Sequence, residues 1–294
     1  MVYLIDASVY VFRAYHSLPP DMTDRDGHPV HAVFGFARFL CDLIERAKPR
    51  LIAVAFDESL ETSFRNRIDP SYKANREPAP EELKRQFGRC REFCDLLGVP
   101  QFASGEYEAD DIIGTLHSQL RAQGVPATLV TRDKDLAQLI REGDVYWNYT
   151  ENLQLRHHEI GAHFGVQPER YADYLALTGD AVDNVRGVPG VGPKTAAALL
   201  TEFASLEELY DNLDAVALLP IRGAAKLPAR LREHREAAFH ARRLTGIVCD
   251  MPLAADRDSL RPRTPDRPAL EEFFDRHNFG PTLRRQSDRL VAQG

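Results

Sequence analysis

Three short apolar runs, each followed within three residues by an aspartate, constrain the fold of this chain more than any other feature. The runs are Val2–Ile5, Leu51–Phe56 and Ala127–Val130, and the aspartates are Asp6, Asp57 and Asp133. Stretches with helical periodicity separate the runs, notably 32–46, 109–122 and 136–141. This alternation predicts an α/β fold with a mostly parallel central sheet flanked by helices. Because parallel strands end at one edge of a sheet, we expect the aspartates to meet in a crevice beyond the carboxyl ends.

Two segments depart from this alternation. Between Phe64 and Glu82 the chain carries scattered charge and three prolines, Pro70, Pro78 and Pro80, which is typical of an insertion rather than of core. Beyond about Asn152 the strand signals disappear and helical stretches dominate, at 168–177, 193–203, 206–210 and 231–244. We therefore expect an α/β core at 1–155 that contains an insertion at about 62–92, followed by a helical region at 156–294.

Composition favours an intracellular protein with a packed core. The chain has 294 residues, of which 44% are hydrophobic, and no window approaches the uncharged length that spans a bilayer. We expect no signal peptide, no membrane association, a cytoplasmic location and a monomer. Four cysteines occur, Cys41, Cys90, Cys94 and Cys249, and a chain of this size does not need disulfides. Cys90 and Cys94 have no histidine pair near them, which favours buried thiols over a zinc site.

The formal charge of −7 conceals two basic segments. Residues 64–91 hold eight basic against four acidic side chains, and residues 221–243 hold seven against two. Binding to phosphate calls for a local basic surface, so the negative total does not exclude a nucleic-acid partner. Many acids must then be concentrated elsewhere.

Nine acids fall at the ends of predicted strands or the starts of predicted helices. They are Asp6, Asp57, Glu108, Asp110, Asp111, Asp133, Asp135, Asp180 and Asp183. One such acid alone is usually a solvated helix cap, but their recurrence weakens that interpretation. Oxygen ligands without histidine or cysteine select Mg²⁺ or Mn²⁺ over zinc, and so many carboxylates cannot stay ionised together without cations. The pattern therefore predicts a site for two metal ions.

A glycine-rich turn runs from Gly187 to Thr195 and leads into an alanine-rich helix. Glycine lets the backbone approach a ligand closely, and free amides at the helix start can bind phosphate, with Lys194 adding charge. A P-loop is excluded because Pro193 separates Gly192 from Lys194. Two interpretations stay open, a structural turn between helices or a helix-hairpin-helix at about 168–203 that grips a nucleic-acid backbone.

Tyr72 lies in the charged insertion, beside Lys73 and Arg76. An aromatic side chain in such a segment can stack on an unpaired base, although most aromatic residues pack in the core. Both interpretations stay open for Tyr72.

Taken together, these segments resemble the five-prime nuclease family, which includes flap endonucleases and the N-terminal nuclease domain of bacterial DNA polymerase I. The matching segments occur in the family's order: Leu4-Ile5-Asp6 with Arg13-Ala-Tyr15-His16, Phe56-Asp57, Phe64-Arg65, Tyr72-Lys73-Ala-Asn-Arg76, Tyr107 to Gly114, Thr131 to Gln138, Leu177 to Asn184, and Gly187 to Thr195. The resemblance extends over nearly the whole chain and weakens after about Arg222. Because no polymerase region is present, we expect a stand-alone bacterial member.

The resemblance implies roles for individual residues. In the family, acids matching Asp6, Asp57, Glu108, Asp110 and Asp111 mainly form one metal site, and those matching Asp133, Asp135, Asp180 and Asp183 form the other. It implies that Lys73 and Arg76 act on the scissile phosphate, and that DNA contacts come from Arg65, Tyr72, Gly190, Gly192, Lys194 and Thr195. The insertion resembles the helical arch of the family, and the glycine turn resembles a helix-three-turn-helix that often binds K⁺ at 187–192.

The expected reaction is hydrolysis of DNA near a five-prime end or at the base of a flap, with flapped, nicked or five-prime-ended duplexes as substrates. Two metal ions, Mg²⁺ or Mn²⁺, would serve as cofactors. Specificity should follow DNA structure, because nothing in the sequence indicates a device for reading base edges. Two alternatives remain, a non-catalytic protein that binds DNA junctions on the same scaffold and, more distantly, a nuclease that cleaves RNA.

Overall fold

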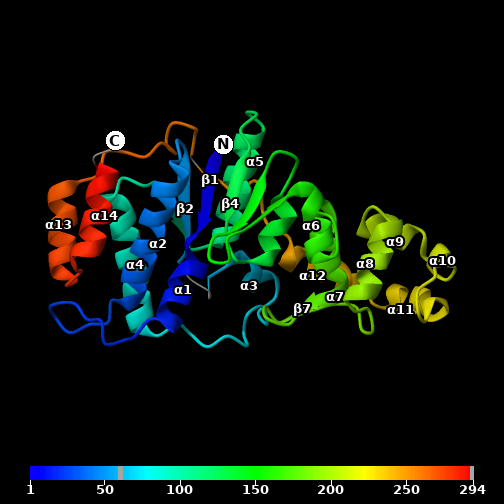
Figure 1. Cartoon of the computed structure of the whole chain (residues 1–294). Coiled ribbons are helices and arrows are strands. Elements are labelled where there is room, and N and C mark those ends of the chain that lie inside the picture. The colour runs from blue at the N-terminus through cyan, green and yellow to red at the C-terminus, as the bar shows by residue number, and fades with distance from the viewer. Residues whose placement is uncertain (59–61, 254, 292–294) are drawn as a thin grey trace.

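A six-stranded sheet forms the centre of the computed structural model, which describes residues 1–58, 62–253 and 255–291 (Figure 1). The strands are β1 (Val2–Asp6), β2 (Ile52–Asp57), β3 (Gln101–Ser104), β4 (Ala127–Val130), β5 (Val145–Asn148) and β6 (Leu153–Arg156), in the order β3-β2-β1-β4-β5-β6. All neighbours pair in parallel except β5 and β6. The chain leaves β1 in one direction to form β2 and β3 and later continues on the other side of β1 with β4. This reversal places a crevice beyond the carboxyl ends of β1 and β4.

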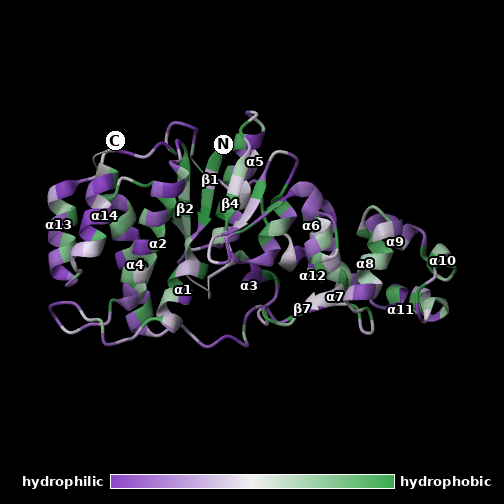
Figure 2. Cartoon of the chain, in the orientation of Figure 1, coloured by the Kyte–Doolittle hydropathy of each residue, from purple (hydrophilic) through white to green (hydrophobic). Residues whose placement is uncertain are grey.

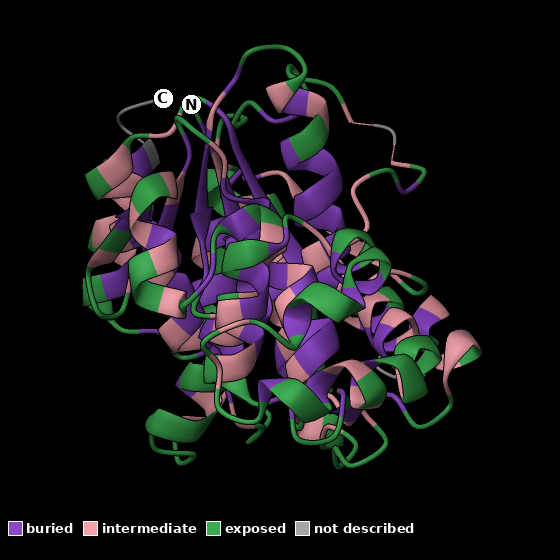
Figure 3. Cartoon of the chain, turned by 90° about the vertical axis from the view of Figure 1, so that its right-hand side faces the viewer, coloured by how far each residue is buried: buried purple, intermediate pink, exposed green. Residues whose placement is uncertain are grey.

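The apolar runs form the central strands because both faces of the sheet are covered. Adjacent residues of β1, Leu4 and Ile5, belong to two different hydrophobic cores on opposite faces, and both are fully buried. Figure 2 shows β1 and β2 coloured as hydrophobic, and Figure 3 shows the strands as the buried interior of the molecule. The predicted fold class, a mostly parallel sheet flanked by helices, is confirmed.

Each face of the sheet has its own helical layer. One face carries α1 (Ala7–Ser17), α2 (His31–Ala47), α4 (Glu81–Leu96), α13 (Arg267–Arg276) and α14 (Pro281–Val291). The other carries α5 (Ala109–Arg121), the 3₁₀ helix η1 (Lys134–Leu139) and α6 (His157–Phe164). The helix expected at 136–141 is therefore a short 3₁₀ helix that begins two residues earlier.

The segment that follows β2 differs from the expected insertion at 62–92. It forms α3 (Phe64–Ile68) and then a run of turns and extended chain over 69–80, which we call the strap, before α4 begins. Leu83, Cys90 and Phe93 of α4 are buried in the core of the α/β part, so this helix is not part of a free-standing arch. Within this segment, α3 and the strap contribute Arg65, Tyr72, Lys73 and Arg76 to a cavity at the carboxyl ends of the strands.

A separate helical part follows the sheet and has its own hydrophobic core (Figure 1, right). It comprises η2 (Pro168–Arg170), α7 (Tyr171–Thr178), the two-residue strands β7 (Gly179–Asp180) and β8 (Val185–Arg186), α8 (Pro193–Glu202), α9 (Leu206–Asp211), α10 (Leu213–Val216), η3 (Ala224–Lys226), α11 (Leu227–Glu233) and α12 (Arg235–Thr245). The expectation that strands end near Asn152 was wrong, because β6, β7 and β8 lie beyond it.

After α12 the chain returns to the α/β part. The amide of Met251 donates to Thr115 Oγ1 of α5, and the amide of Ile52 donates to the carbonyl of Leu260. Helices α13 and α14 then pack beside α4 and α2, with Leu270 and Phe273 buried in the same core (Figure 1, left). The expected helical region at 156–294 therefore does not pack as one unit, because its last two helices complete the α/β core.

Among the described residues, no helix is both long enough and apolar enough to cross a membrane. The four cysteines are free, and Cys41, Cys90 and Cys94 are buried, as the sequence predicts for apolar thiols.

Candidate active site

A cavity of about 130 Å³ lies beyond the carboxyl ends of the central strands. Seven of the nine predicted acids line it: Asp6, Asp57, Glu108, Asp110, Asp133, Asp135 and Asp183. Asp180 and Asp111 are not among its lining residues. Asp180 lies next to the cavity, with Oδ2 3.6 Å from Lys134 Nζ.

The strand ends and the start of α5 position the first group of acids. Asp6 and Asp57 are the last residues of the paired strands β1 and β2. Asp57 Oδ1 accepts a hydrogen bond of 2.8 Å from the amide of Ala109, which joins β2 to the first turn of α5. Thr131 Oγ1 donates to Asp6 Oδ2 at 2.8 Å. Hydrogen bonds from the protein thus hold both of these carboxylates.

The second group comes from η1 and the β7–β8 hairpin. Asp133 Oδ1 accepts from the amide of Asp135 at 2.9 Å and caps η1. Asp180 Oδ1 accepts from the amide of Val182 at 2.8 Å, which closes the hairpin that carries Asp183. These local bonds project Asp133, Asp135 and Asp183 into the cavity.

Burial and mutual repulsion make these carboxyl groups weak acids. Burial, followed by the charges of Asp57 and Asp133, raises the pKa of Asp6 to about 8. Burial and the charges of Asp133 and Asp180 raise the pKa of Asp135 to about 8. The pKa of Asp110 also lies well above its usual range, first through burial and then through Asp133, Asp6 and Asp57.

Lys73 of the strap is the main cation of the cavity. Its Nζ lies 2.5 Å from Glu108 Oε2 and 3.8 Å from Asp183 Oδ2, and its side chain is only 10% exposed. Its backbone is left-handed, with φ of 55°, and its amide donates to the carbonyl of Asp183. A strained backbone held by such contacts is frequent at functional sites. Arg76 also pairs with Asp183.

Lys73 also sets the ionisation of Glu108. Burial by itself would raise the pKa of Glu108, but the charges of Lys73 and Arg65 outweigh it and lower that pKa. For Lys73, burial would lower the pKa, and the charges of Glu108 and Asp183 raise it instead. The pKa shifts therefore favour the ionised forms of Glu108 and Lys73, whereas those of Asp6 and Asp135 favour the protonated forms below about pH 8.

The structure places Tyr72 differently from the sequence-based hypothesis of base stacking. Its side chain is 3% exposed, and its hydroxyl lies 3.3 Å from Glu108 Oε2 and 3.2 Å from Asp183 Oδ2. A ring that is enclosed in this way has no free face for a base. We correct the assignment, because the geometry makes Tyr72 a support for two carboxylates.

Arg65 and Asp111 also need correction. Arg65 is 3% exposed and Asp111 is fully buried, and they form a two-bond ion pair with N···O distances of 2.6 and 2.7 Å. Arg65 lines the cavity, but its guanidinium is committed to Asp111 and to the carbonyls of Leu244 and Gly246 rather than free for DNA. An aspartate with both oxygens engaged, away from the cavity, has no lone pair to offer a metal ion.

The residues around the cavity fit divalent cations. The donor set consists of carboxylate oxygens, which are the ligands that Mg²⁺ and Mn²⁺ prefer. Asp135 Oδ1 is buried and has no hydrogen-bond partner, an arrangement that is costly unless a ligand completes it. The raised pKa values of Asp6, Asp110 and Asp135 favour their protonated forms without a metal ion, and a bound cation would favour the ionised forms.

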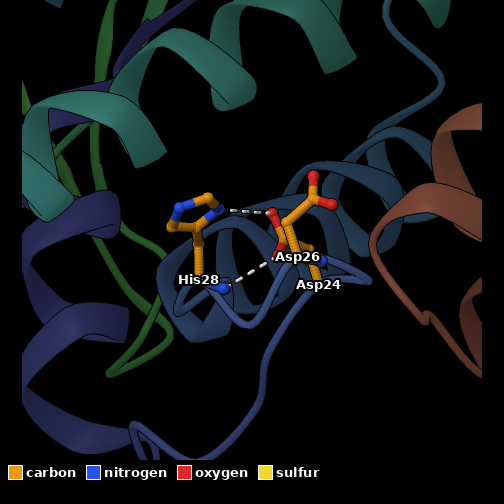
Figure 4. A group of neighbouring side chains, drawn as sticks. All are labelled: Asp24, Asp26 and His28. Atoms are coloured by element: carbon orange, nitrogen blue, oxygen red, sulfur yellow. Dashed lines mark hydrogen bonds and ion pairs between the residues drawn. The ribbon is translucent and has the colours of Figure 1, made fainter.

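Another acidic group, Asp24, Asp26 and His28, lies in the loop between α1 and α2 (Figure 4). Asp24 Oδ1 accepts from the amides of Asp26 and His28, so this carboxylate closes a turn next to the Thr23–Pro29 bridge. Asp26 and His28 are exposed. The geometry is explained by the turn itself.

The glycine turn connects the β7–β8 hairpin to α8. A Cβ on Gly187 would lie 2.3 Å from the amide nitrogen of Gly179, so only glycine permits this close approach of two backbones. Gly190 has φ of 76°, and Gly192 precedes Pro193, the first residue of α8. Lys194 is exposed in the first helical turn, where backbone amides lack intrahelical partners.

Sequence reasoning missed three residues near these features. Phe12, an exposed aromatic residue of α1, lines the cavity, and Ser8 Oγ accepts from the amide of Asp57. Arg230 of the second basic segment lies against Gly190. Phe12 lies six residues after Asp6 in the sequence, but periodicity alone does not show that α1 faces the cavity.

Both parts of the chain match known protein families. Residues 1–165 match the model of the 5'-3' exonuclease N-terminal, resolvase-like domain, and residues 166–268 match that of the 5'-3' exonuclease C-terminal SAM fold. The chain is 42% identical over 272 residues to DNA polymerase I of Pseudomonas aeruginosa, covering 92% of this chain but 30% of the polymerase. The chain thus spans about a third of the length of such polymerase relatives.

A relative of the same length also exists. The 5'-3' exonuclease of Aquifex aeolicus is 33% identical over 292 residues, which cover 99% of this chain and 96% of that protein. Among solved structures, the bacteriophage T5 flap endonuclease in complex with DNA and metal ions shares the fold, with a TM-score of 0.66 and 20% identity over 100% of this chain and 99% of the other. From these matches, which extend over both of its parts, we conclude that the chain belongs to the 5'-3' exonuclease family.

Proposed function

We propose that this chain hydrolyses DNA phosphodiesters at five-prime ends and at the base of flaps, with two divalent cations as cofactors. The observation that carries this proposal is the convergence of seven carboxylates and Lys73 on one cavity, with a buried oxygen of Asp135 left without a partner. The products would be a five-prime phosphate and a three-prime hydroxyl. The cations supply activation of water and stabilisation of the leaving oxygen when they are bound.

Mg²⁺, or Mn²⁺ in its place, is the cofactor we propose. Asp6, Asp57, Glu108 and Asp110 would hold one ion, and Asp133, Asp135, Asp180 and Asp183 the other. The elements that carry the acids support this division, since the first group comes from β1, β2 and the start of α5 and the second from the start of η1 and the β7–β8 hairpin. Asp133 repels members of both groups and so lies between them.

The strap would contact the reacting phosphate. Lys73 Nζ is within ion-pair distance of both Glu108 and Asp183. Because we assign these two acids to different metal ions, Lys73 would lie close to a phosphate bound at both metal sites. The Arg76 side chain is 35% exposed, more than that of Lys73, and would bind the same phosphate from the outer side. Phe12 offers the aromatic face at the mouth that the enclosed Tyr72 lacks, and we assign base stacking to it.

The glycine turn would hold the duplex. Gly190, Gly192, Lys194 and Thr195 present backbone amides and a cation at the start of α8, which suits a phosphate. Arg230 adds a positive charge beside Gly190. K⁺ binding at 187–192 stays a prediction from the family resemblance. Action as a monomer stays a prediction from the sequence.

A cleavage assay tests this function. End-labelled flap, nicked and gapped DNA and a matched flap of RNA would be incubated with the purified chain in Mg²⁺ and in excess chelator. We expect Mg²⁺-dependent cleavage of DNA near the flap base, with RNA cut much more slowly. Asp24→Asn, which changes an acid of the α1–α2 loop, is the matched control and should cleave as the wild type does.

The assay also separates the two alternatives. Tight binding of flap DNA without cleavage in Mg²⁺ or Mn²⁺ would identify a non-catalytic junction-binding protein. Preferential cleavage of the RNA flap would identify an RNA nuclease. Cleavage that persists in excess chelator would refute metal dependence.

A further inference from the structure

Asp111 has no lone pair left for a ligand. Oδ1 accepts from Arg65 Nη2 at 2.7 Å and from the amide of Val248 at 2.9 Å. Oδ2 accepts from Arg65 Nη1 at 2.6 Å and from the amide of Glu108 at 3.1 Å. A carboxylate offers about four acceptor sites, and all of them are filled by the protein.

Asp111 differs in this respect from the acids of the cavity. Asp135 Oδ1 is buried without a partner, Asp57 accepts from the amide of Ala109, and Asp6 accepts from Thr131 and from the amide of Val9. Asp6, Asp57 and Asp135 thus keep acceptor capacity. Glu108 is also engaged, by Ser63, Tyr72 and Lys73, but it lines the cavity, whereas Asp111 does not. A carboxylate that is both fully satisfied and outside the cavity fixes geometry and is not placed to bind a cation.

Arg65 joins three segments that meet at the cavity. It belongs to α3, which leads into the strap, and it grips Asp111 in the first turn of α5. Its Nε donates to the carbonyl of Leu244 at 2.8 Å and its Nη2 to the carbonyl of Gly246 at 2.9 Å, at the end of α12. Its Nη1 also lies 3.9 Å from Glu108 Oε1. Four donated bonds from one buried guanidinium fix these segments relative to one another.

Two proposed metal ligands, Glu108 and Asp110, lie close to Asp111 at the start of α5. Asp111 holds the amide of Glu108, and Asp110 lies between them in the sequence. The direction in which Glu108 and Asp110 enter the cavity therefore depends on where the first turn of α5 is held. Groups that orient metal ligands in this way typically change metal affinity tenfold to a hundredfold when they are removed.

We infer that Arg65 and Asp111 form a positioning pair, which does not touch metal or DNA and which sets the two ligands of α5 against the strap and the end of α12. This inference rests on the proposed function, because it concerns the ligands of the same site. In this inference Asp111 holds the first turn of α5 in place, and Arg65 holds the carboxylate of Asp111.

The two possible roles of Asp111 predict opposite effects of changing Arg65. If Asp111 were a ligand, Arg65 would compete with the cation, and Arg65→Gln would tighten metal binding. If the pair positions Glu108 and Asp110, the same change weakens metal binding although it removes a positive charge. Arg65→Lys separates charge from geometry, because lysine keeps the charge but cannot form the two-bond fork.

The test is titration of the full chain with Mn²⁺ by calorimetry, with circular dichroism and thermal unfolding to establish that each variant is folded. We expect Arg65→Lys, Arg65→Gln and Asp111→Asn to weaken Mn²⁺ binding by about tenfold or more, with two ions still bound at saturation. Single-turnover cleavage should fall in parallel, while flap binding in Ca²⁺ at saturating metal changes little.

Asp144→Asn is the matched control. Asp144 is also almost fully buried and also engages α5, through His117 at 2.8 Å, but near the other end of that helix. This variant should lose stability without losing Mn²⁺ affinity. Equal weakening in Asp144→Asn would reduce the effect to general destabilisation and overturn the inference.

Other outcomes are equally decisive. Loss of one of two ions in Asp111→Asn, or tighter Mn²⁺ binding in Arg65→Gln, would make Asp111 a ligand. Unchanged affinity in Arg65→Lys would show that the fork does not set the ligands, and this variant decides the matter if Arg65→Gln does not fold. Absence of cleavage by a wild type that binds two Mn²⁺ would instead refute the proposed function.

Discussion

Removal of the Lys73 ammonium should slow the chemical step without weakening the hold on metal. In the structure this group lies 2.5 Å from Glu108 and 3.8 Å from Asp183, so a phosphate bound between those acids would come within about 4 Å of it. A unit charge at ~4 Å in an effective dielectric constant of about 20 contributes roughly 4 kcal/mol. Because only part of a charge develops in the transition state, about 2.7 kcal/mol is expected, which corresponds to a hundredfold in rate.

The assay for Lys73→Ala is single-turnover cleavage of a flap at saturating enzyme, together with binding of the same DNA in Ca²⁺. We expect the rate to fall by about a hundredfold and DNA binding to change much less, because the group acts mainly on the transition state. Mn²⁺ binding should be unchanged or tighter, since Lys73 competes with cations for Glu108.

Arg67→Ala is the control for loss of one positive charge. Arg67 belongs to α3 and pairs with Glu106 at the surface, with a side chain that is 63% exposed. This variant should cleave at close to the wild-type rate. A Lys73→Ala cleavage rate within a few-fold of wild type, together with a collapse of DNA binding, would show that Lys73 only helps to hold the substrate.

Three further predictions concern the metal site and the glycine turn. Asp135→Asn should nearly abolish flap cleavage at all Mg²⁺ concentrations, and a rate near that of wild type would contradict its assignment as a ligand. Lys194→Glu should weaken duplex binding and flatten its dependence on salt, because one counterion fewer is released; an unchanged dissociation constant across a salt series would argue against a duplex contact. The raised pKa values of Asp6 and Asp135, about 8 against 3.8 for a free aspartate, mean that the folded metal-free chain holds protons that the unfolded chain releases. Its stability to heat should therefore fall as pH rises from about 4 to 8, whereas Mn²⁺ affinity, measured by calorimetry, should rise over pH 6 to 8 as protons cease to compete; an affinity independent of pH would refute this.

The central strands and the acids that follow them could be predicted because both depend on local sequence pattern. The apolar runs at β1, β2 and β4 are continuous since both faces of these strands are covered, and such runs are visible without any structure. Strand β3 was missed because all four of its residues are only partly buried, which leaves no apolar run. Strands β7 and β8 have two residues each and carry no periodicity.

The site was predictable as a set of residue types but not as a set of roles. Glu108, Asp110 and Asp111 are equivalent in a sequence, as three acids at a helix start. Their roles diverge because Arg65, 46 residues away along the chain from Asp111, takes both oxygens of one of them. In the same way, the sequence shows Tyr72 beside two cations but not that its ring is enclosed. Long-range contacts of this kind decide function and leave no periodic signal.

The return of the chain after α12 makes the helical part an insert rather than an appendage. It leaves the sheet after α6 and rejoins it at Ile247 and Val248, whose amides bond Gln138 and Asp111. The insert is thus tethered at both ends, and one tether ends on the aspartate that supports the α5 ligands. A movement of the helical part would therefore act on Asp111 through the amide of Val248. If the glycine turn holds the duplex as proposed, the orientation of that turn and the position of the α5 ligands are linked through the chain at 245–248 and one hydrogen bond to Asp111.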